Sequence, residues 1–212
     1  MHLLKKLGLV ALVSSMSFAG QANAAAFKVD PAKSEIVVQV FKEGVGAALA
    51  HDHVIRATQY TGTVEFDPAN PASGSIAVEV KTGSLKADEP AVRKKFKLTS
   101  ELSDKDRATV EGNMKGDGQL DTAKFPTIAF KSTDIQRQPD GKYKVTGNLT
   151  LHGRTQKVSF PATVAMEGEN FHGKGSVKFK QSIFGYQPYS ALLGAIKNQD
   201  DVILHLDILA TP

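Results

Sequence analysis

The chain has 212 residues, no cysteine and a formal net charge of +4 at pH 7. This length suits one β-barrel or sandwich domain. The missing cysteines exclude disulfides, thiol catalysis and thiolate metal sites. The small positive charge is spread along the chain, which argues against a nucleic-acid partner.

The first residues have the features of a secretory signal peptide. Lys5 and Lys6 form a positive start, Leu7–Phe18 is mostly apolar, and Ala22-Asn23-Ala24 is a small-residue cleavage motif. We predict a signal peptide over 1–24 that is cleaved near Ala24. Cleavage leaves 188 of the 212 residues and lowers the charge from +4 to +2, because two lysines are lost. We expect a periplasmic protein whose mature chain has no transmembrane segment.

Apolar and polar residues alternate in the first half of the mature chain, as expected for strands with one buried face. Ser34–Phe41 is the first predicted strand, and Gly44–Ala50 is a turn or a single helical turn. His51-Asp52-His53 leads into a long second strand that ends at Phe66. Ser75–Lys81 is the third strand, with its isoleucine and valines facing inward.

The alternation then stops, and the sequence predicts one or two short helices. Ala87–Lys97 contains Asp88 as a plausible N-cap, and its basic run Arg93-Lys94-Lys95 is interpreted as a solvated helix face. Ser103–Met114 begins with an S-x-x-D pattern that is typical of a capping box. These segments form a short helical insertion within a β protein.

Alternation returns in the second half and predicts five more strands. They are Thr127–Ser132, Tyr143–Leu151, Val158–Met166, Asn170–Lys180 and Asp201–Ala210. In Asn170–Lys180 two glycines stand on the dry face, which indicates a bend or a close ligand. The fold class is therefore all-β, an eight-stranded antiparallel β-barrel that either packs solid or holds one small ligand.

Three segments of the chain resemble the YceI-like family, and the likeness spans Asp30 to the C-terminus. The family consists of exported lipocalin-like barrels that bind polyisoprenoid lipids, and it has no established catalytic residues. The resemblance implies a YceI-like, lipocalin-like lipid-binding barrel over 25–212. The three segments are Lys124-Phe125-Pro126-Thr127-Ile128-Ala129-Phe130-Lys131-Ser132, Val145-Thr146-Gly147-Asn148-Leu149-Thr150-Leu151-His152-Gly153-Arg154-Thr155 and Ser182-Ile183-Phe184-Gly185.

Pattern and resemblance together predict a binding or carrier protein for an apolar chain lipid of polyisoprenoid, quinone or fatty-acyl type. The lipid lies inside the barrel, and no other cofactor is expected. Burial of one CH₂ is worth about 0.8 kcal/mol, so a few isoprene units offset an association cost of about 4–15 kcal/mol. The predicted lipid-binding residues are Phe130, Val145, Leu149, Leu151, Phe160, Val164, Phe179, Phe184, Leu204 and Leu206.

Two alternatives remain open at this stage. In the first, the inward side chains fill the barrel, which then serves as a scaffold or partner-binding domain. In the second, the chain is a metal-handling or stress-related periplasmic protein that uses His51 and His53, which an extended strand would project to the same side. Such a metal site needs a third ligand. We find no catalytic motif and expect no enzyme activity; pairing of two copies as a homodimer also stays open.

Overall fold

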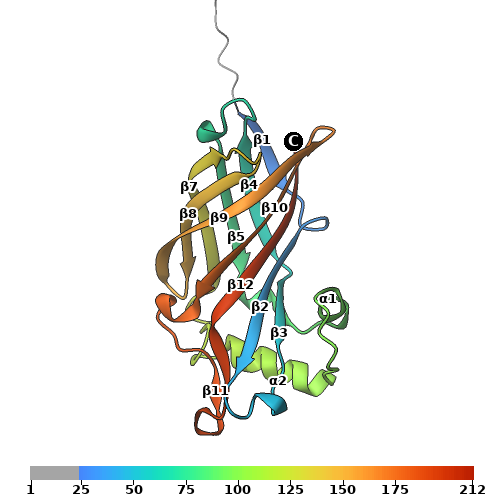
Figure 1. Cartoon of the computed structure of the whole chain (residues 1–212), viewed down its shortest axis with the longest axis vertical. Coiled ribbons are helices and arrows are strands. Elements are labelled where there is room, and N and C mark those ends of the chain that lie inside the picture. The colour runs from blue at the N-terminus through green and yellow to red at the C-terminus, as the bar shows by residue number, and fades with distance from the viewer. Residues whose placement is uncertain (1–23) are drawn as a thin grey trace, which may run out of the picture.

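The computed structural model describes residues 24–212. The predicted signal peptide therefore lies outside the described residues, except for Ala24. The chain forms one elongated barrel with its helices gathered near one end (Figure 1). We call the end at which the C-terminus lies the upper end, and the end with α2 and β11 the lower end.

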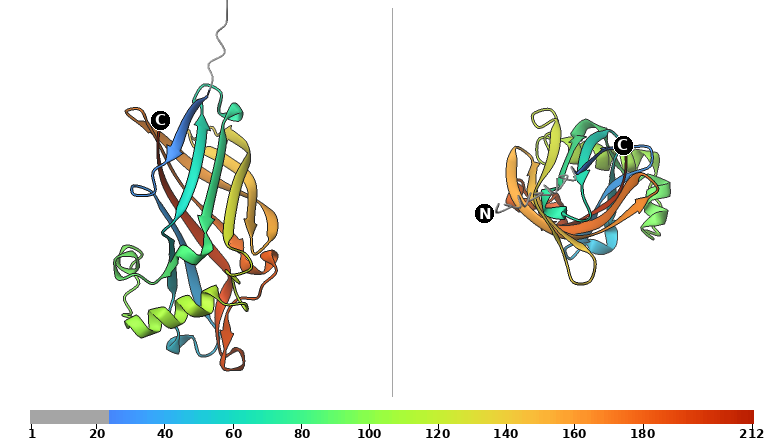
Figure 2. Two further views of the ribbon diagram at one scale, coloured as in Figure 1. Left: turned by 180° about the vertical axis from the view of Figure 1, so that it is seen from behind. Right: turned by 90° about the horizontal axis from the view of Figure 1, so that it is seen from above.

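Eight antiparallel strands form a closed ring, which confirms the predicted barrel. The ring closes because the last strand pairs with the first, through Lys28 opposite Thr211 and Val29 opposite Ala210. The view along the barrel shows the ring (Figure 2). In ring order the strands are β1 (Ala25–Val29), β4 (Tyr60–Phe66), β5 (Ser75–Lys81), β7 (Thr127–Arg137), β8 (Tyr143–Leu151), β9 (Arg154–Glu167), β10 (Asn170–Lys180) and β12 (Ile196–Thr211).

Four further strands belong to the lower half. β2 (Glu35–Glu43), β3 (His53–Ala57) and β6 (Leu85–Ala87) continue the sheet beyond β12, and β11 (Ser190–Ala191) pairs with the start of β12. β1 was not predicted, and the predicted long second strand that ends at Phe66 is two strands, β3 and β4. β12 is long enough to pair with β2 and then with β1. The parity of the inward residues changes across the break, since Ala57 faces the interior in β3 and Val64 in β4.

β7 runs five residues beyond the predicted Thr127–Ser132. Its register against β8 shifts between Ser132 and Asp134. A bulge of this kind adds one residue and exchanges the two faces of the strand. Ile128 therefore lines the interior on one side of the bulge and Ile135 on the other, although their numbers differ in parity. The interrupted parity is the reason that the alternation ends at Ser132.

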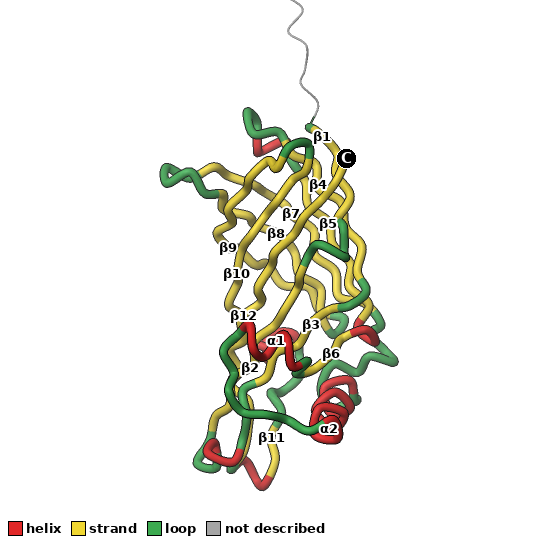
Figure 3. The backbone as a smooth tube through the Cα atoms, turned by 90° about the vertical axis from the view of Figure 1, so that its right-hand side faces the viewer, coloured by secondary structure: helices red, strands yellow, loops and turns green. Residues whose placement is uncertain are grey.

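The predicted helical insertion is present between β6 and β7. α1 spans Pro90–Lys95, and α2 spans Asp104–Lys115 with Ser103 as its N-cap, whose hydroxyl accepts a hydrogen bond from the Asp106 amide at 3.1 Å. Both helices lie beside the lower half of the barrel (Figure 3). Neither described helix has the length and apolar character that a bilayer span requires.

The prediction that Asp88 caps α1 is wrong. The N-cap is Glu89, and Asp88 has a φ of +54° and is fully buried. Asp is among the few residue types that adopt this left-handed conformation readily. The turn directs the carboxylate inward, toward partners that are described below.

Aromatic side chains close the interior at the upper end. Phe66 packs edge-on against Tyr143 and Phe171, with ring centroids 5.4 and 5.3 Å apart, and Phe27 lies 6.0 Å from Phe171. All four rings are buried and belong to one apolar cluster. We call this cluster the upper plug. The lower half of the interior is consequently the side on which a site has room to open.

One glycine of the wall makes room for an aromatic ring. A Cβ on Gly147 in β8 would lie 2.6 Å from both Cε2 of Phe130 and the carbonyl oxygen of Lys131. Side chains do not tolerate such contacts, and the neighbouring backbone oxygen cannot easily move. The glycine thus fixes the position of the Phe130 ring against the wall.

We predict that Gly147→Ala lowers the free energy of unfolding by about 1–3 kcal/mol, because the added methyl group overpacks the wall. Gly112→Ala is the matched control, since nothing lies within 4 Å of its Cβ position in α2, and it should gain up to about 1 kcal/mol. Urea denaturation measures both variants. Equal stability of Gly147→Ala and wild type would contradict this packing argument.

Candidate functional site

The interior of the barrel is not filled by its own side chains. A cavity of about 170 Å³ runs inside the wall, and its lining is aliphatic and aromatic apart from glycines and Lys174. We call it the upper chamber. Several inward side chains are only partly buried, although they lie within the barrel, because they face this space. Examples are Phe130, Val164, Leu204 and Leu206.

Nine of the ten predicted lipid-binding residues line the upper chamber; contact with a lipid itself remains a prediction. Phe184 is the exception, since it lies in a 3₁₀ turn outside the lining. Its ring is completely buried and packs edge-on against Phe179 at 5.5 Å, so it supports the wall from behind. The nine lining residues are Phe130, Val145, Leu149, Leu151, Phe160, Val164, Phe179, Leu204 and Leu206.

Strands from the first half of the chain also line the upper chamber, although none of their residues is among the ten predicted lipid-binding residues. Those strands alternate just as clearly, so the signal that identifies their inward residues was present. Their lining residues include Ile36, Val38, Ile55, Val64, Ile76, Val78, Val80 and Leu85.

The two glycines on the dry face of β10 serve aromatic packing next to the chamber. A Cβ on Gly173 would lie 2.9 Å from Cε1 of Phe171, and one on Gly175 would lie 3.1 Å from Cδ2 of Phe160. Both glycines line the upper chamber. Side chains at these positions would displace the rings or fill the space.

A second cavity of about 170 Å³ adjoins the first toward the lower end. We call it the lower chamber. Val110 and Met114 of α2 form part of its lining, so the helix replaces sheet wall there. The two chambers share the lining residues Val38, Ile55, Leu85, Ile128, Leu151 and Phe179. Polar residues are frequent only in the lower chamber: His53, Asn113, Gln119, Gln181, Tyr186, Tyr189 and Asn198.

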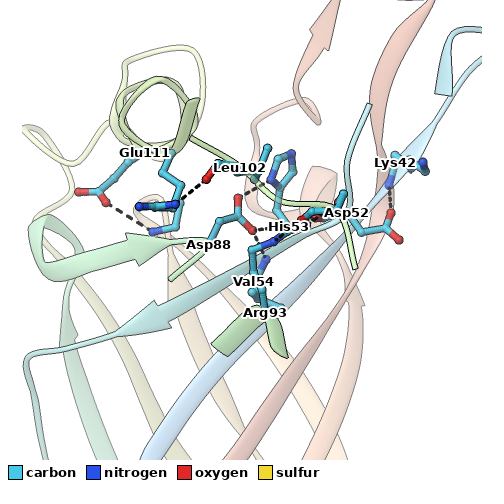
Figure 4. A network of polar contacts seen from close by, with 11 residues as sticks. Lys42, Asp52, His53, Val54, Asp88, Arg93, Leu102 and Glu111 are labelled. Carbon is cyan, nitrogen blue, oxygen red and sulfur yellow. Dashed lines mark hydrogen bonds and ion pairs between the residues drawn. The ribbon is translucent and has the colours of Figure 1, made fainter. Parts of the chain in front are cut away.

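His53 is held in the lower chamber by a buried carboxylate. Its Nδ1 lies 2.6 Å from Oδ2 of Asp88, while Oδ1 of Asp88 accepts hydrogen bonds from Nη1 of Arg93 at 2.7 Å and from the amide of Val54 at 3.1 Å. Figure 4 shows Asp88 among these partners. We call Asp88, His53 and Arg93 the buried triad.

Burial by itself would raise the pKa of Asp88. The hydrogen bonds from His53, Val54 and Arg93 outweigh it and hold that pKa below its usual value. The interpretation of Arg93 as part of a solvated helix face is wrong, because its side chain is only 6% exposed. Arg93 also donates to the Asp52 carbonyl at 2.9 Å, which ties α1 to β3.

His51 does not share a strand with His53, contrary to the prediction, because β3 begins at His53. The carboxylate between the two histidines is occupied as well, since Asp52 Oδ1 accepts from the Lys42 amide at 2.8 Å. Across residues 24–212 no group of three His, Cys, Asp or Glu side chains is placed to hold a metal ion. The His51 and His53 pair therefore gains no third ligand in this part of the chain.

Two other histidines stabilise the outer surface. His172 lies beside Glu167 and Asp207, whose carboxylates raise its pKa. His205 packs under the Phe96 ring at 5.0 Å and lies 2.7 Å from Oε1 of Gln39. Neither residue lines a chamber.

The family-like segments converge at the lower end of the wall. The turn after β8 places the His152 ring 4.4 Å from Phe125, and the Phe125 ring occupies the space beside Gly153 that a Cβ would need. Gly185 has a φ of +88°, and the guanidinium of Arg154 lies directly against it. These motif residues thus pack the turns together rather than lining the upper chamber.

The fold and the site define the class of this protein: it is a binding protein of β-barrel fold whose interior is apolar. The sequence matches the YceI-like domain over residues 27–210, so the chain belongs to the YceI-like family. Proteins of this family are barrels for apolar ligands and are not recognised enzymes.

The chain is similar to the UPF0312 protein of Yersinia pestis, with 28% identity over 179 residues and coverage of 81% of this chain and 82% of the relative. The UPF0312 protein of Pseudomonas putida is 29% identical over 166 residues, which cover 78% and 76% of the two chains. Both likenesses extend across most of the barrel.

Two solved structures share the fold. BcnA of Burkholderia cenocepacia is 25% identical, with a TM-score of 0.66 and coverage of 86% of this chain and 99% of BcnA. A mutant YCEI protein of Campylobacter jejuni with a monobromobimane guest is 19% identical, with a TM-score of 0.56 and coverage of 74% and 84%.

We predict that Asp88→Ala destabilises the protein by about 3–5 kcal/mol, because it leaves the Arg93 guanidinium buried without its counter-charge. Glu43→Ala is the control, since the exposed Glu43–Lys197 pair at 3.5 Å should be worth about 1 kcal/mol or less. Thermal and urea denaturation compare the variants. A loss for Asp88→Ala no larger than for Glu43→Ala would refute a stabilising role of the buried triad.

The lowered pKa of Asp88 also predicts a pH dependence. A carboxyl group whose folded pKa lies below the unfolded value of about 3.9 stabilises the protein above that value and loses this contribution on acidification. Wild type should therefore exceed Asp88→Asn in stability at pH 7, and the difference should shrink below pH about 4. Urea titrations at a series of pH values measure it. A difference that stays constant down to pH 3 would count against the assignment.

Proposed function

We propose that this protein is a periplasmic binding or carrier protein for an apolar chain lipid of the polyisoprenoid, quinone or fatty-acyl type. The lipid chain lies in the upper chamber, whose lining is aliphatic and aromatic apart from glycines and Lys174. The observation that carries the proposal is the unfilled apolar interior, whose inward phenylalanines and leucines stay partly exposed to the cavity.

The size and chemistry of the cavity support this choice. An apolar cavity of about 150 Å³ stays dry and binds a benzene-sized molecule, and the upper chamber is of that order before the adjoining lower chamber is added. Each buried methylene contributes about 0.8 kcal/mol. A chain that enters both chambers therefore gains several kcal/mol from apolar contact.

The upper plug and the helices support a direction of entry. The plug packs four aromatic rings across the interior, so the chain end of the lipid comes to rest below it. The lower chamber is walled by a helix and loops as well as by strands. Loops and helix ends open at a smaller cost than hydrogen-bonded sheet. A lipid accordingly enters at the lower end, chain first.

Protein purified from its native host should release a chain lipid on organic extraction, and mass spectrometry identifies it. Delipidated protein should bind the uncharged fluorescent probe N-phenyl-1-naphthylamine and exchange it for geranylgeraniol. Val164→Phe should weaken geranylgeraniol binding at least about tenfold, because the larger ring occupies the upper chamber. Ala165→Phe carries the same ring on the outward face of the same strand and should bind like wild type.

The proposal fails if extracts contain no lipid and neither the probe nor geranylgeraniol binds. Equal affinities for Val164→Phe and Ala165→Phe would place any binding outside the barrel. Circular dichroism and unfolding curves of both variants verify that the barrel is intact.

A further inference from the structure

The lower chamber differs from the upper chamber in the kind of ligand atom that it can satisfy. Its lining includes imidazole, amide and phenol groups, which the upper chamber lacks except for Tyr143 of the plug. Among the described residues that line the lower chamber there is no Lys, Arg, Asp or Glu. The lower chamber therefore has a mainly apolar lining with several hydrogen-bonding groups and, among its described residues, no carboxylate, ammonium or guanidinium group.

Some of these polar groups have hydrogen-bonding capacity left over. Within the described chain, Nε2 of His53 and the side-chain amide of Asn198 make no hydrogen bond, yet neither is sealed in the protein interior. Gln181 and Tyr186 are partly satisfied, since Gln181 Nε2 donates to the Gln199 carbonyl at 2.9 Å. Because these groups are not sealed from water, they are available to a ligand that enters the lower chamber in place of solvent.

Within the buried triad, Asp88 determines which ring nitrogen of His53 is available to a ligand in the lower chamber. The Asp88 carboxylate engages Nδ1 of His53, so Nε2 is the ring nitrogen that stays free for a ligand in the lower chamber. Because Arg93 balances the charge of Asp88, the pair adds no net charge behind the ring. A fixed imidazole nitrogen, an amide and a phenol together provide hydrogen-bond donors and acceptors at one place.

From this arrangement we propose that the lower chamber binds the polar end of the lipid, and that this end is an uncharged hydrogen-bonding group such as a hydroxyl, carbonyl or amide. His53, Asn198 and Tyr186 contact it. The inference rests on the proposed function, since it assumes that the chain of the same lipid lies in the upper chamber.

The same lining disfavours an anionic head. A phosphate or diphosphate moved out of water needs basic partners within contact distance. The Arg93 guanidinium, which shares Asp88 with His53, is not available to such a head, because it is already paired with Asp88 at 2.7 Å. A prenyl diphosphate should therefore bind worse than the alcohol with the same chain.

The test compares three twenty-carbon ligands: geranylgeraniol, geranylgeranyl diphosphate, which differs from it only at the head, and phytane, a headless saturated hydrocarbon with the same carbon skeleton. Displacement of N-phenyl-1-naphthylamine from delipidated full-length protein gives their affinities. We expect the alcohol to bind about tenfold or more tightly than the diphosphate, and about three- to tenfold more tightly than phytane, as for one or two net hydrogen bonds.

Asn198→Leu is the main variant, because it removes the amide at nearly constant volume and breaks no hydrogen bond of the side chain. It should weaken geranylgeraniol binding about threefold or more and leave phytane unchanged. His53→Leu should do the same more strongly. Because His53→Leu removes one hydrogen-bond partner of Asp88, the affinities of this variant are compared with those of wild type only if the variant remains folded. Ala165→Phe again serves as the control, now for both ligands.

The outcomes separate the two claims. If phytane and geranylgeraniol both fail to bind, the proposed lipid function is wrong. If both bind equally, or if the diphosphate binds as tightly as the alcohol, the lipid function stands and the neutral-head site is wrong. An equal effect of Asn198→Leu on all three ligands likewise overturns the site, because a head contact cannot weaken a headless chain.

Discussion

The pairing of β12 with both β10 and β1 is the constraint on which the rest of the structure depends. It closes eight strands into a ring, and an eight-stranded ring is just wide enough for side chains to meet across it or to enclose one ligand. Whether space remains is then decided by single residues. Here glycines in β8 and β10 leave room for the rings of Phe130, Phe160 and Phe171, and a cavity of about 170 Å³ remains inside the wall.

The same closure explains why the chain divides its strands. β12 has 16 residues and exceeds the height of the ring, so its first half needs a second partner. β2 takes that place, and β3 and β6 follow it at the lower end. On the far side of β6 the described sheet continues no further. α2 packs there instead, which makes the lower end a mixed wall of sheet, helix and loop.

The alternation of the sequence was sufficient to predict a closed barrel, seven of its eight ring strands in whole or in part, and nine of the residues that line its upper chamber. Period-two patterns report which face of a strand is dry, and a closed ring turns every dry face inward. The pattern did not predict β1 or the break between β3 and β4, although the inward parity changes between Ala57 and Val64. It also does not predict the environment of Asp88. Its position before Pro90 suggests a helix cap, and only the positive φ and the tertiary contacts with His53 and Arg93 reveal a buried acid. Phe184 was misassigned because a motif residue in a 3₁₀ turn has no strand parity to orient it.

The division of the cavity into an apolar and a polar part follows from this topology. A strand that is buried on one face can present only its inward residues, and in this barrel those are apolar in the upper half. Helix and loop residues have no such alternation, so they can bring amides and phenols to the cavity at the lower end. Polar groups that face a cavity must be positioned, because an unsatisfied group moves or takes up water. The buried triad positions one of them from outside the cavity wall, with its charges balanced by one another. A ligand with a long apolar chain and a short neutral head matches both parts at once, whereas a pure hydrocarbon leaves the lower groups unsatisfied and a charged head finds no counter-charge.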